Sequence, residues 1–192
     1  MSTGATARWD ALARYIEQAE TRAIRIGVAV QAPDGARFSH RGDERFISAS
    51  TIKIPIMVEI YRQIDRGNLT LDDRFTLTKE DICPGSGVLL QLHLGLELTL
   101  RDIVYLMMSI SDNTATNMLI DLAGMENVNE AIASLGMPNS ALGRKMRGVP
   151  AKDGAPENWA TANDFRVCID AILTGAAASA RIPTPISRWT GT

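Results

Sequence analysis

The feature that most constrains the fold is a long series of helical segments that follows a single pair of strand-like segments. Residues 24–30 alternate apolar with small or polar side chains, and a second strand is predicted at 37–42 after a turn at 32–36. Apolar residues then recur at helical spacing in five segments, which are 50–67, 98–110, 113–124, 126–136 and 161–175. This order predicts an α+β fold in which one antiparallel hairpin accompanies a mostly helical lobe.

The N-terminal stretch predicts an amphipathic helix and not a cleaved leader. Its apolar face is expected from residues at helical spacing, namely Trp9, Leu12, Tyr15 and Ile16. Acidic residues interrupt the continuous apolar segment that a signal peptide needs, namely Asp10, Glu17 and Glu20. The sequence also has no run of about 18 apolar residues. We therefore expect no membrane span and, for the chain as written, a cytoplasmic location.

Charge and residue spacing exclude several classes of partner. The 192 residues have a net charge of −2, and the basic residues are scattered. Nucleic acid and membrane surfaces are therefore not expected as partners. Cys83 and Cys168 lie far apart in the sequence, and His40 and His93 stand alone, so no metal site of recognisable spacing is present. Whether the two cysteines form a disulfide stays open.

The first candidate for chemistry is the segment SASTIKIP at 48–55, in which Ser50 and Lys53 stand among small and apolar residues. On a helix, side chains at i and i+3 share a face, so these two would meet about one turn apart. A serine hydroxyl needs a base, and apolar surroundings lower the pKa of a lysine toward that of a useful base. The same pattern also occurs by chance in many helices, where the lysine is a surface residue.

The second candidate is Ser111-Asp112-Asn113, which separates two apolar helical segments. Polar residues in that position must be hydrogen-bonded or used by a ligand. One interpretation is an ordinary turn, with Asp112 or Asn113 as the N-cap of the following helix. In the other, Ser111 relays a proton from Ser50 to a leaving group and Asn113 holds a substrate amide.

Together, the two motifs resemble the penicillin-recognising serine enzymes, and class A β-lactamases in particular, whose signature includes S-x-x-K and S-D-N. The similarity covers roughly residues 22–175 and is most evident at 45–78, 98–124 and 142–146. It implies an α/β sandwich of the serine β-lactamase and penicillin-binding type. In this fold a sheet lobe packs against an all-helical lobe, and the cleft lies between them.

The resemblance also implies a role for each matching residue. Ser50 would be the acylated nucleophile, and Lys53 its base or proton relay. Ser111 would pass the proton to the β-lactam nitrogen. Asn113 would bind the acylamide side chain, and Ser86, in a loop that borders the cleft, has a weaker claim to substrate binding.

Further properties follow from the same resemblance. Asp112 would hold the turn in place. The family uses no metal or organic cofactor, and its members are often exported. The implied substrates are β-lactams or related small amides and esters, opened through an acyl-enzyme.

Two departures from the family pattern bear on activity. The K-T-G motif of the family has no counterpart in this sequence. The most similar segment is Trp189-Thr190-Gly191-Thr192, in which tryptophan replaces the lysine. The strand with K-T-G supplies one oxyanion-hole amide, and such a donor is worth about 2.7–4 kcal/mol in the transition state. The loop after 142–146 should hold a glutamate that hydrolyses the acyl-enzyme, but its only carboxylates are Asp153 and Glu157. Either Glu157 is that base, or it closes the loop and deacylation is slow.

We expect a single β-lactamase-like domain at 1–175 and an atypical tail at 176–192. The domain would comprise an N-terminal helix and hairpin at 1–48, a helical lobe with the site motifs at 49–160, and a helix at 161–175 that returns to the sheet lobe. The tail has neither helix nor strand period, so the C-terminal strands are expected to be absent, as from a truncated, frameshifted or engineered end. An unpaired sheet edge would then permit self-association. Three functions stay open, namely a β-lactam hydrolase, a penicillin-binding peptidase or esterase with slow deacylation, and a catalytically incomplete fragment.

Overall fold

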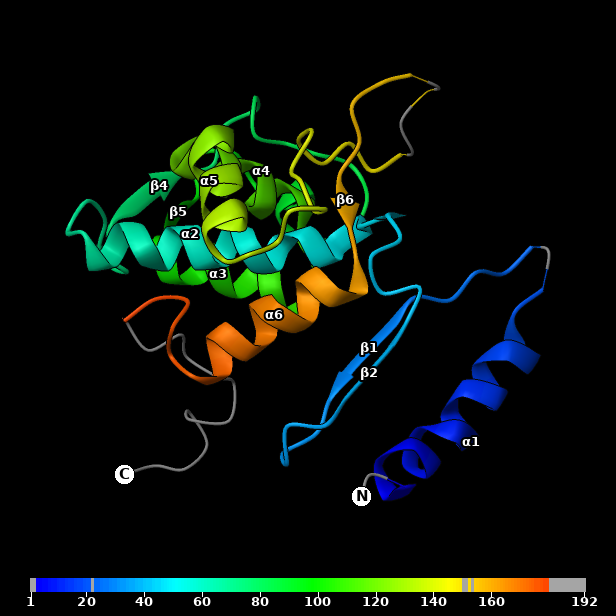
Figure 1. The fold of residues 1–192 in the computed structure, drawn as a ribbon. Coiled ribbons are helices and arrows are strands. Elements are labelled where there is room, and N and C mark those ends of the chain that lie inside the picture. The colour runs from blue at the N-terminus through cyan, green and yellow to red at the C-terminus, as the bar shows by residue number, and fades with distance from the viewer. Residues whose placement is uncertain (1–2, 22, 150–151, 153, 180–192) are drawn as a thin grey trace.

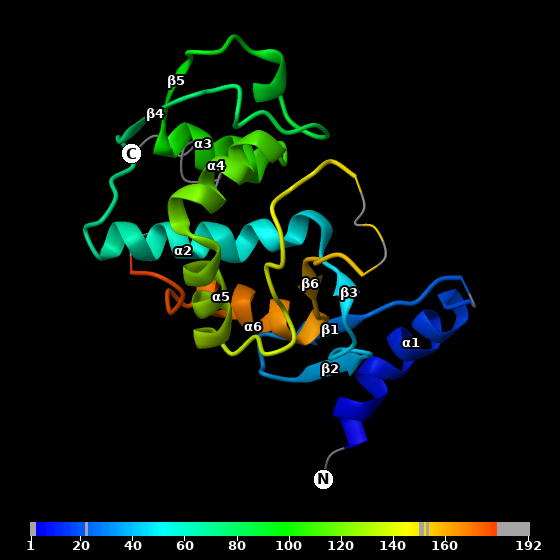
Figure 2. The same ribbon diagram turned by 90° about the horizontal axis from the view of Figure 1, so that it is seen from above.

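The computed structural model describes residues 3–21, 23–149, 152 and 154–179, and its elements form two groups (Figure 1). The helical group consists of α2 (Lys53–Asp65), β4 (Arg74–Thr76), β5 (Glu97–Thr99), α3 (Leu100–Ser109), α4 (Asn113–Ala123) and α5 (Met125–Ser134). The second group consists of α1 (Thr3–Ala19), β1 (Val28–Gln31), β2 (Arg37–His40) and α6 (Ala162–Leu173). The short antiparallel pair β3 (Phe46–Ile47) and β6 (Trp159–Ala160) lies between them (Figure 2). The predicted helices and hairpin are thus confirmed.

The hydrophobic core forms around α2, which runs between α3 and α4 on one side and α6 on the other (Figure 2). Ile56 and Ile60 on α2, and Ile52 just before it, are completely buried. They pack in one cluster with side chains of the neighbouring helices, including Leu100, Ile103, Met107, Leu119, Ile120 and Ile132. Each such side chain contributes about 1.5–3 kcal/mol when fully buried. This packing fixes the start of α2, where Ser50 and Lys53 lie.

Side-chain caps set the starts of the helices around the core. Thr99 forms a capping box at the start of α3, because its hydroxyl accepts from Asp102 N while the Asp102 carboxylate accepts from Thr99 N. Thr161 caps α6 in the same way, by accepting from Asp164 N. A threonine at this position satisfies a backbone donor that has no partner within the helix.

The hairpin is shorter than predicted, because β1 begins at Val28 and not at residue 24. Thr21 and Ile24 exchange two backbone hydrogen bonds in a turn, and Ile26 N donates to the Glu20 carboxylate at 2.9 Å. These backbone groups are therefore not available to a ladder. The pairing that remains is antiparallel and runs from Val28↔His40 to Gln31↔Arg37.

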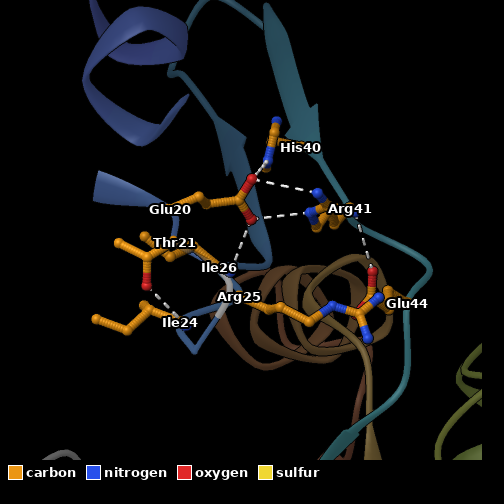
Figure 3. A network of polar contacts seen from close by, with 8 residues as sticks. All are labelled: Glu20, Thr21, Ile24, Arg25, Ile26, His40, Arg41 and Glu44. Atoms are coloured by element: carbon orange, nitrogen blue, oxygen red, sulfur yellow. Dashed lines mark hydrogen bonds and ion pairs between the residues drawn. The ribbon is translucent and has the colours of Figure 1, made fainter. Parts of the chain in front are cut away.

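An ion-pair network ties the end of α1 to the hairpin (Figure 3). The Glu20 carboxylate accepts from Arg41 Nε at 2.8 Å and lies 3.2 Å from His40 Nε2. The Arg41 hydrogen bond, followed by that from Ile26 N, lowers the pKa of Glu20 to about 2. Glu44 joins the network through Arg41 and Arg25. The N-terminal helix therefore joins the hairpin by charge as well as by packing.

The hairpin lies between α1 and α6 in both views (Figures 1 and 2). Trp9 of α1 stacks on Phe38 of β2, with ring centroids 5.7 Å apart, and Ile16 is buried. The prediction that Tyr15 shares this apolar face is wrong, since its side chain is 71% exposed. Successive residues of a helix point in different directions around its axis, so Tyr15 faces away from the side on which Ile16 is buried. The narrow contact with the hairpin does not reach it.

The beginning of the expected tail packs against the helical group. Ala177 is buried, and its carbonyl accepts from Arg62 Nε at 2.8 Å. The tail from residue 180 on, including Trp189-Thr190-Gly191-Thr192, lies outside the described residues. The cysteines Cys83 and Cys168 are both buried free thiols, so the open question of a disulfide is answered against pairing. None of the helices in the described part of the chain is both long and apolar enough to cross a membrane.

Candidate active site

Ser50 lies in a tight turn at the entrance to α2. The turn is a 3₁₀ helix, η1 (Ala49–Ile52), which continues directly into α2. Ala49, just before the serine, has a φ of 45°. Such a left-handed conformation costs a non-glycine residue about 1–3 kcal/mol and is found most often at functional sites. The turn leaves Ser50 exposed, whereas Ile52 two residues later is fully buried.

Lys53 is a buried lysine, and its side chain is only 2% exposed. Its Nζ donates to Ser111 O at 2.6 Å, to Ser111 Oγ at 2.9 Å and to Asn113 Oδ1 at 3.0 Å. Burial lowers the pKa of Lys53 to about 8, although the negative charge of Asp112 opposes this shift. The amine is therefore close to half neutral in mildly basic solution, which contradicts the alternative of a surface lysine.

Ser111 connects the lysine to Ser50. Its Oγ accepts from Lys53 Nζ and donates to Ser50 Oγ at 2.8 Å. Its backbone has a φ of 59°, which turns the side chain back from the end of α3 toward η1. We expected Lys53 to meet Ser50 directly across one helical turn, but the hydrogen bonds of the amine are directed to Ser111 and Asn113. The reason is that three acceptors, two on Ser111 and one on Asn113, surround Nζ, so the amine is linked to Ser50 through Ser111 Oγ.

Asp112 is completely buried and organises the backbone around the site. Its Oδ2 accepts from Val88 N at 2.7 Å and from Leu89 N at 2.9 Å, while its Oδ1 accepts from Ala115 N at 3.0 Å. The turn interpretation is thus confirmed for Asp112, which is the N-cap of α4. A side chain at Gly87, where φ is +119°, would clash with this carboxylate. Asp112 therefore holds the 86–89 loop against α4.

Replacing Asp112 with asparagine is expected to lower the free energy of unfolding by about 1.5–3 kcal/mol, the range for hydrogen bonds to a charged group. The amide keeps the shape of the carboxylate, but only one of its two terminal atoms is an acceptor, so at least one of the three backbone hydrogen bonds is lost together with the charge. Urea unfolding followed by circular dichroism measures the change. As a control, Asp121→Asn removes an exposed carboxylate paired with Lys145 and should cost about 0–1 kcal/mol. Equal losses in the two variants would contradict this role of Asp112.

Asn113 and Ser86 lie together at one wall of the site. Asn113 Nδ2 donates to Pro84 O at 3.0 Å, and its backbone N donates to Ser86 O at 2.9 Å. The side-chain oxygen accepts from Lys53, so both ends of the amide are held. The structure therefore brings together all five of the residues expected from the sequence.

These residues border a pocket of about 360 Å³. Its lining combines the predicted Ser50, Ser86 and Asn113 with residues of the loop that follows α5, namely Arg144, Met146, Arg147, Gly148, Val149, Glu157 and Asn158. The loop is fastened at its base, because Asn158 Oδ1 accepts from Gly143 N and Arg144 N and Asn158 O accepts from Ser48 N. Asn158 and Arg147 were not predicted, because a single polar residue in a loop has no periodic or motif signal.

Glu157 is engaged with an arginine across the base of this loop. Its carboxylate contacts Arg144 Nη2 at 2.8 Å through Oε1 and at 3.0 Å through Oε2, and Oε1 also accepts from Asn158 N at 2.8 Å. The side chain is only 8% exposed. This geometry favours the alternative in which Glu157 closes the loop over the one in which it activates water.

A second cavity, of about 390 Å³, lies between β2 and α6 and is lined by none of the predicted site residues. Cationic and anionic side chains line it together, namely Arg37, Arg166, Asp43 and Asp164. Within the described ranges, no group of three or more histidine, cysteine, aspartate or glutamate residues could hold a metal ion. The predicted site residues therefore lie at the pocket beside Ser50 and not at this cavity.

Comparisons with known proteins agree with this geometry. The family model described as the Beta-lactamase enzyme family matches residues 7–182. A beta-lactamase from Rhodobacter capsulatus is 34% identical over 138 residues, which are 70% of this chain and 47% of that protein. A solved beta-lactamase from Sphaerobacter thermophilus is 54% identical, with a TM-score of 0.86 over 88% of this chain and 64% of that one. The solved structure of PBP-A is 30% identical, with a TM-score of 0.77 over 93% of this chain and 65% of that one.

The chain thus spans about half the length of the curated relative and slightly less than two thirds of each solved structure. Within that span, the fold expected from the sequence is confirmed, since the two solved structures include both a beta-lactamase and a penicillin-binding type of protein. From the match over most of its length and the agreement in fold, the chain belongs to the beta-lactamase enzyme family.

Proposed function

We propose that this chain is a serine hydrolase of the class A β-lactamase type, which opens the β-lactam ring by forming an acyl-enzyme on Ser50. The proposal rests on one observation, the continuous hydrogen-bond path from Lys53 Nζ through Ser111 Oγ to Ser50 Oγ. Because the pKa of the buried amine is about 8, a fraction of it is neutral near pH 7 and can accept the proton of the serine hydroxyl connected to it.

The path allows the acylation step to be written with its protons. Ser50 Oγ attacks the carbonyl carbon of the lactam, and its proton passes to Ser111 while the proton of Ser111 Oγ passes to the neutral Lys53 amine. The carbonyl–nitrogen bond of the ring then breaks. The same path, used in reverse, returns a proton through Ser111 Oγ to the nitrogen that leaves. The products are an ester on Ser50 and an amine, and Asn113 is placed to hold the acylamide side chain.

A second candidate is a penicillin-binding protein that acylates and releases its product slowly. The contacts of Glu157 favour this candidate. Glu157 supplies the carboxylate in the pocket lining, and that carboxylate is held by Arg144 and Asn158. A carboxylate in an ion pair is a weak base because its charge is already stabilised. Asp153, the other candidate in the loop, lies outside the described residues.

A chromogenic cephalosporin, followed by colour and by intact mass, tests both candidates. We expect one equivalent of acyl adduct; continued colour supports the hydrolase, and an adduct that persists after one burst of colour supports slow release. Glu157→Gln separates the two roles of the carboxylate. If Glu157 closes the loop, the lifetime of the adduct should stay at its wild-type value, whereas loss of a general base would lengthen it by about 10²–10⁴-fold. Folded protein that shows neither colour nor adduct would contradict both candidates and leave the catalytically incomplete fragment.

A further inference from the structure

The pocket beside Ser50 has an unbalanced positive charge. Three charged side chains line it, namely Arg144, Arg147 and Glu157. Arg144 and Glu157 neutralise each other through their ion pair. Arg147 is exposed, and the structure shows no ion pair between it and any carboxylate in the ranges that it describes. One guanidinium is therefore free to meet an anion at this pocket.

Close backbone packing places Arg147 near the amide of Asn113. A Cβ on Gly85 would lie 2.6 Å from Asn113 Nδ2 and 3.1 Å from Gly148 Cα. A Cβ on Gly148, where φ is +69°, would lie 2.4 Å from Pro84 O. The backbone at Gly148 therefore packs against Pro84 and Gly85, the same segment that contacts the Asn113 side chain. Arg147 is the residue immediately before this contact.

We propose that Arg147 is a specificity-determining residue, which favours substrates whose acyl side chain carries a carboxylate. This inference rests on the proposed function. An acylamide held by Asn113 would extend its side chain along the wall formed by the 146–149 segment, toward the guanidinium. A planar guanidinium binds a carboxylate with two parallel hydrogen bonds, which a neutral side chain cannot form.

The expected preference is modest, because Arg147 is exposed to solvent. An exposed ion pair of this kind corresponds to a change of about two- to fivefold in rate or affinity. The attraction should also weaken as salt screens the two charges, with a screening length of about 10 Å at 0.1 M and 3 Å at 1 M.

Two penicillins that differ only in the carboxylate provide the probe, namely benzylpenicillin and α-carboxybenzylpenicillin. For each variant, the ratio of their second-order acylation rates is measured by intact mass, with the carboxylated substrate in the numerator. Arg147→Gln should lower this ratio about two- to fivefold, and Arg147→Glu should lower it further. Arg45→Gln, which removes an exposed arginine outside the pocket, should keep the wild-type ratio. In 1 M salt, the wild-type ratio should fall toward that of Arg147→Gln.

The outcomes distinguish this inference from the function on which it rests. Acylation by both penicillins with the same ratio in the wild type and in Arg147→Gln overturns the role of Arg147 and leaves the proposed function standing. An equal fall of the ratio in Arg45→Gln would indicate a general effect of net charge and would also overturn it. Folded wild-type protein that neither becomes labelled by the two penicillins nor consumes them overturns the proposed function together with this inference.

Discussion

Ser50→Ala is expected to abolish the acyl adduct formed with a chromogenic cephalosporin. The substitution removes the hydroxyl oxygen that would form the ester, and no other nucleophile among the described residues completes the path from Lys53 through Ser111 to the pocket. Removing the nucleophile of a serine hydrolase has an effect of about 10⁶-fold on turnover. Intact mass sampled soon after mixing, together with the colour change, measures the effect, because each acylated molecule gains the mass of the substrate and each turnover releases colour.

The matched control for this variant is Ser109→Ala. Ser109 is an exposed serine whose hydroxyl donates to Tyr105 O within α3, and it does not line the pocket. Its loss should leave both the adduct and the colour change at wild-type levels. Circular dichroism of Ser50→Ala should match the wild type, since Ser50 is exposed. An adduct that survives in folded Ser50→Ala would show that another residue is the nucleophile.

Lys53→Met is expected to slow acylation by about 10²–10⁴-fold, the contribution of a general base. Methionine fills the apolar space of the lysine stem but cannot accept the proton that leaves Ser50. Lys53→Arg should be equally slow, because a guanidinium keeps the positive charge and does not lose its proton in this pH range. Stopped-flow measurements with a chromogenic cephalosporin give the acylation rate of each variant.

The pH dependence of the wild type provides an independent check on Lys53. Its pKa is lowered to about 8, and only the neutral amine accepts a proton. The acylation rate should therefore rise about tenfold per pH unit below 8 and level off above it. Lys79→Met, which removes an exposed lysine outside the pocket, should keep the wild-type profile. A wild-type rate that does not change between pH 6 and pH 9 would contradict the role of Lys53 as the base.

Much of the fold could be predicted from local patterns. Helices α2 to α6 have clear apolar periods, and the start of α3 has the threonine and aspartate spacing of a capping box. The short pairs β3–β6 and β4–β5 were not predicted. Each has two or three residues per strand, and its partner lies far away in the sequence, so neither period nor turn type indicates the pairing.

For the site, the sequence by itself determined which residues are the candidates for the chemistry. Ser50, Lys53, Ser111 and Asn113 stand out because polar side chains interrupt apolar helical segments, and such groups must be satisfied or used. The spacing of Ser50 and Lys53 did not determine their contact, since the amine reaches the nucleophile through Ser111. That link depends on the φ of 59° at Ser111 and on the packing of α2 against α3 and α4.

Only the tertiary structure decided the surroundings of the nucleophile. It pairs Glu157 with Arg144, which favours a loop contact over the role of base, and it places Arg147 beside the pocket without a partner among the described residues. The reason is physical. A motif indicates which groups can react, but the charge state and the neighbours of those groups depend on contacts between distant segments. A local sequence pattern carries no information about such contacts.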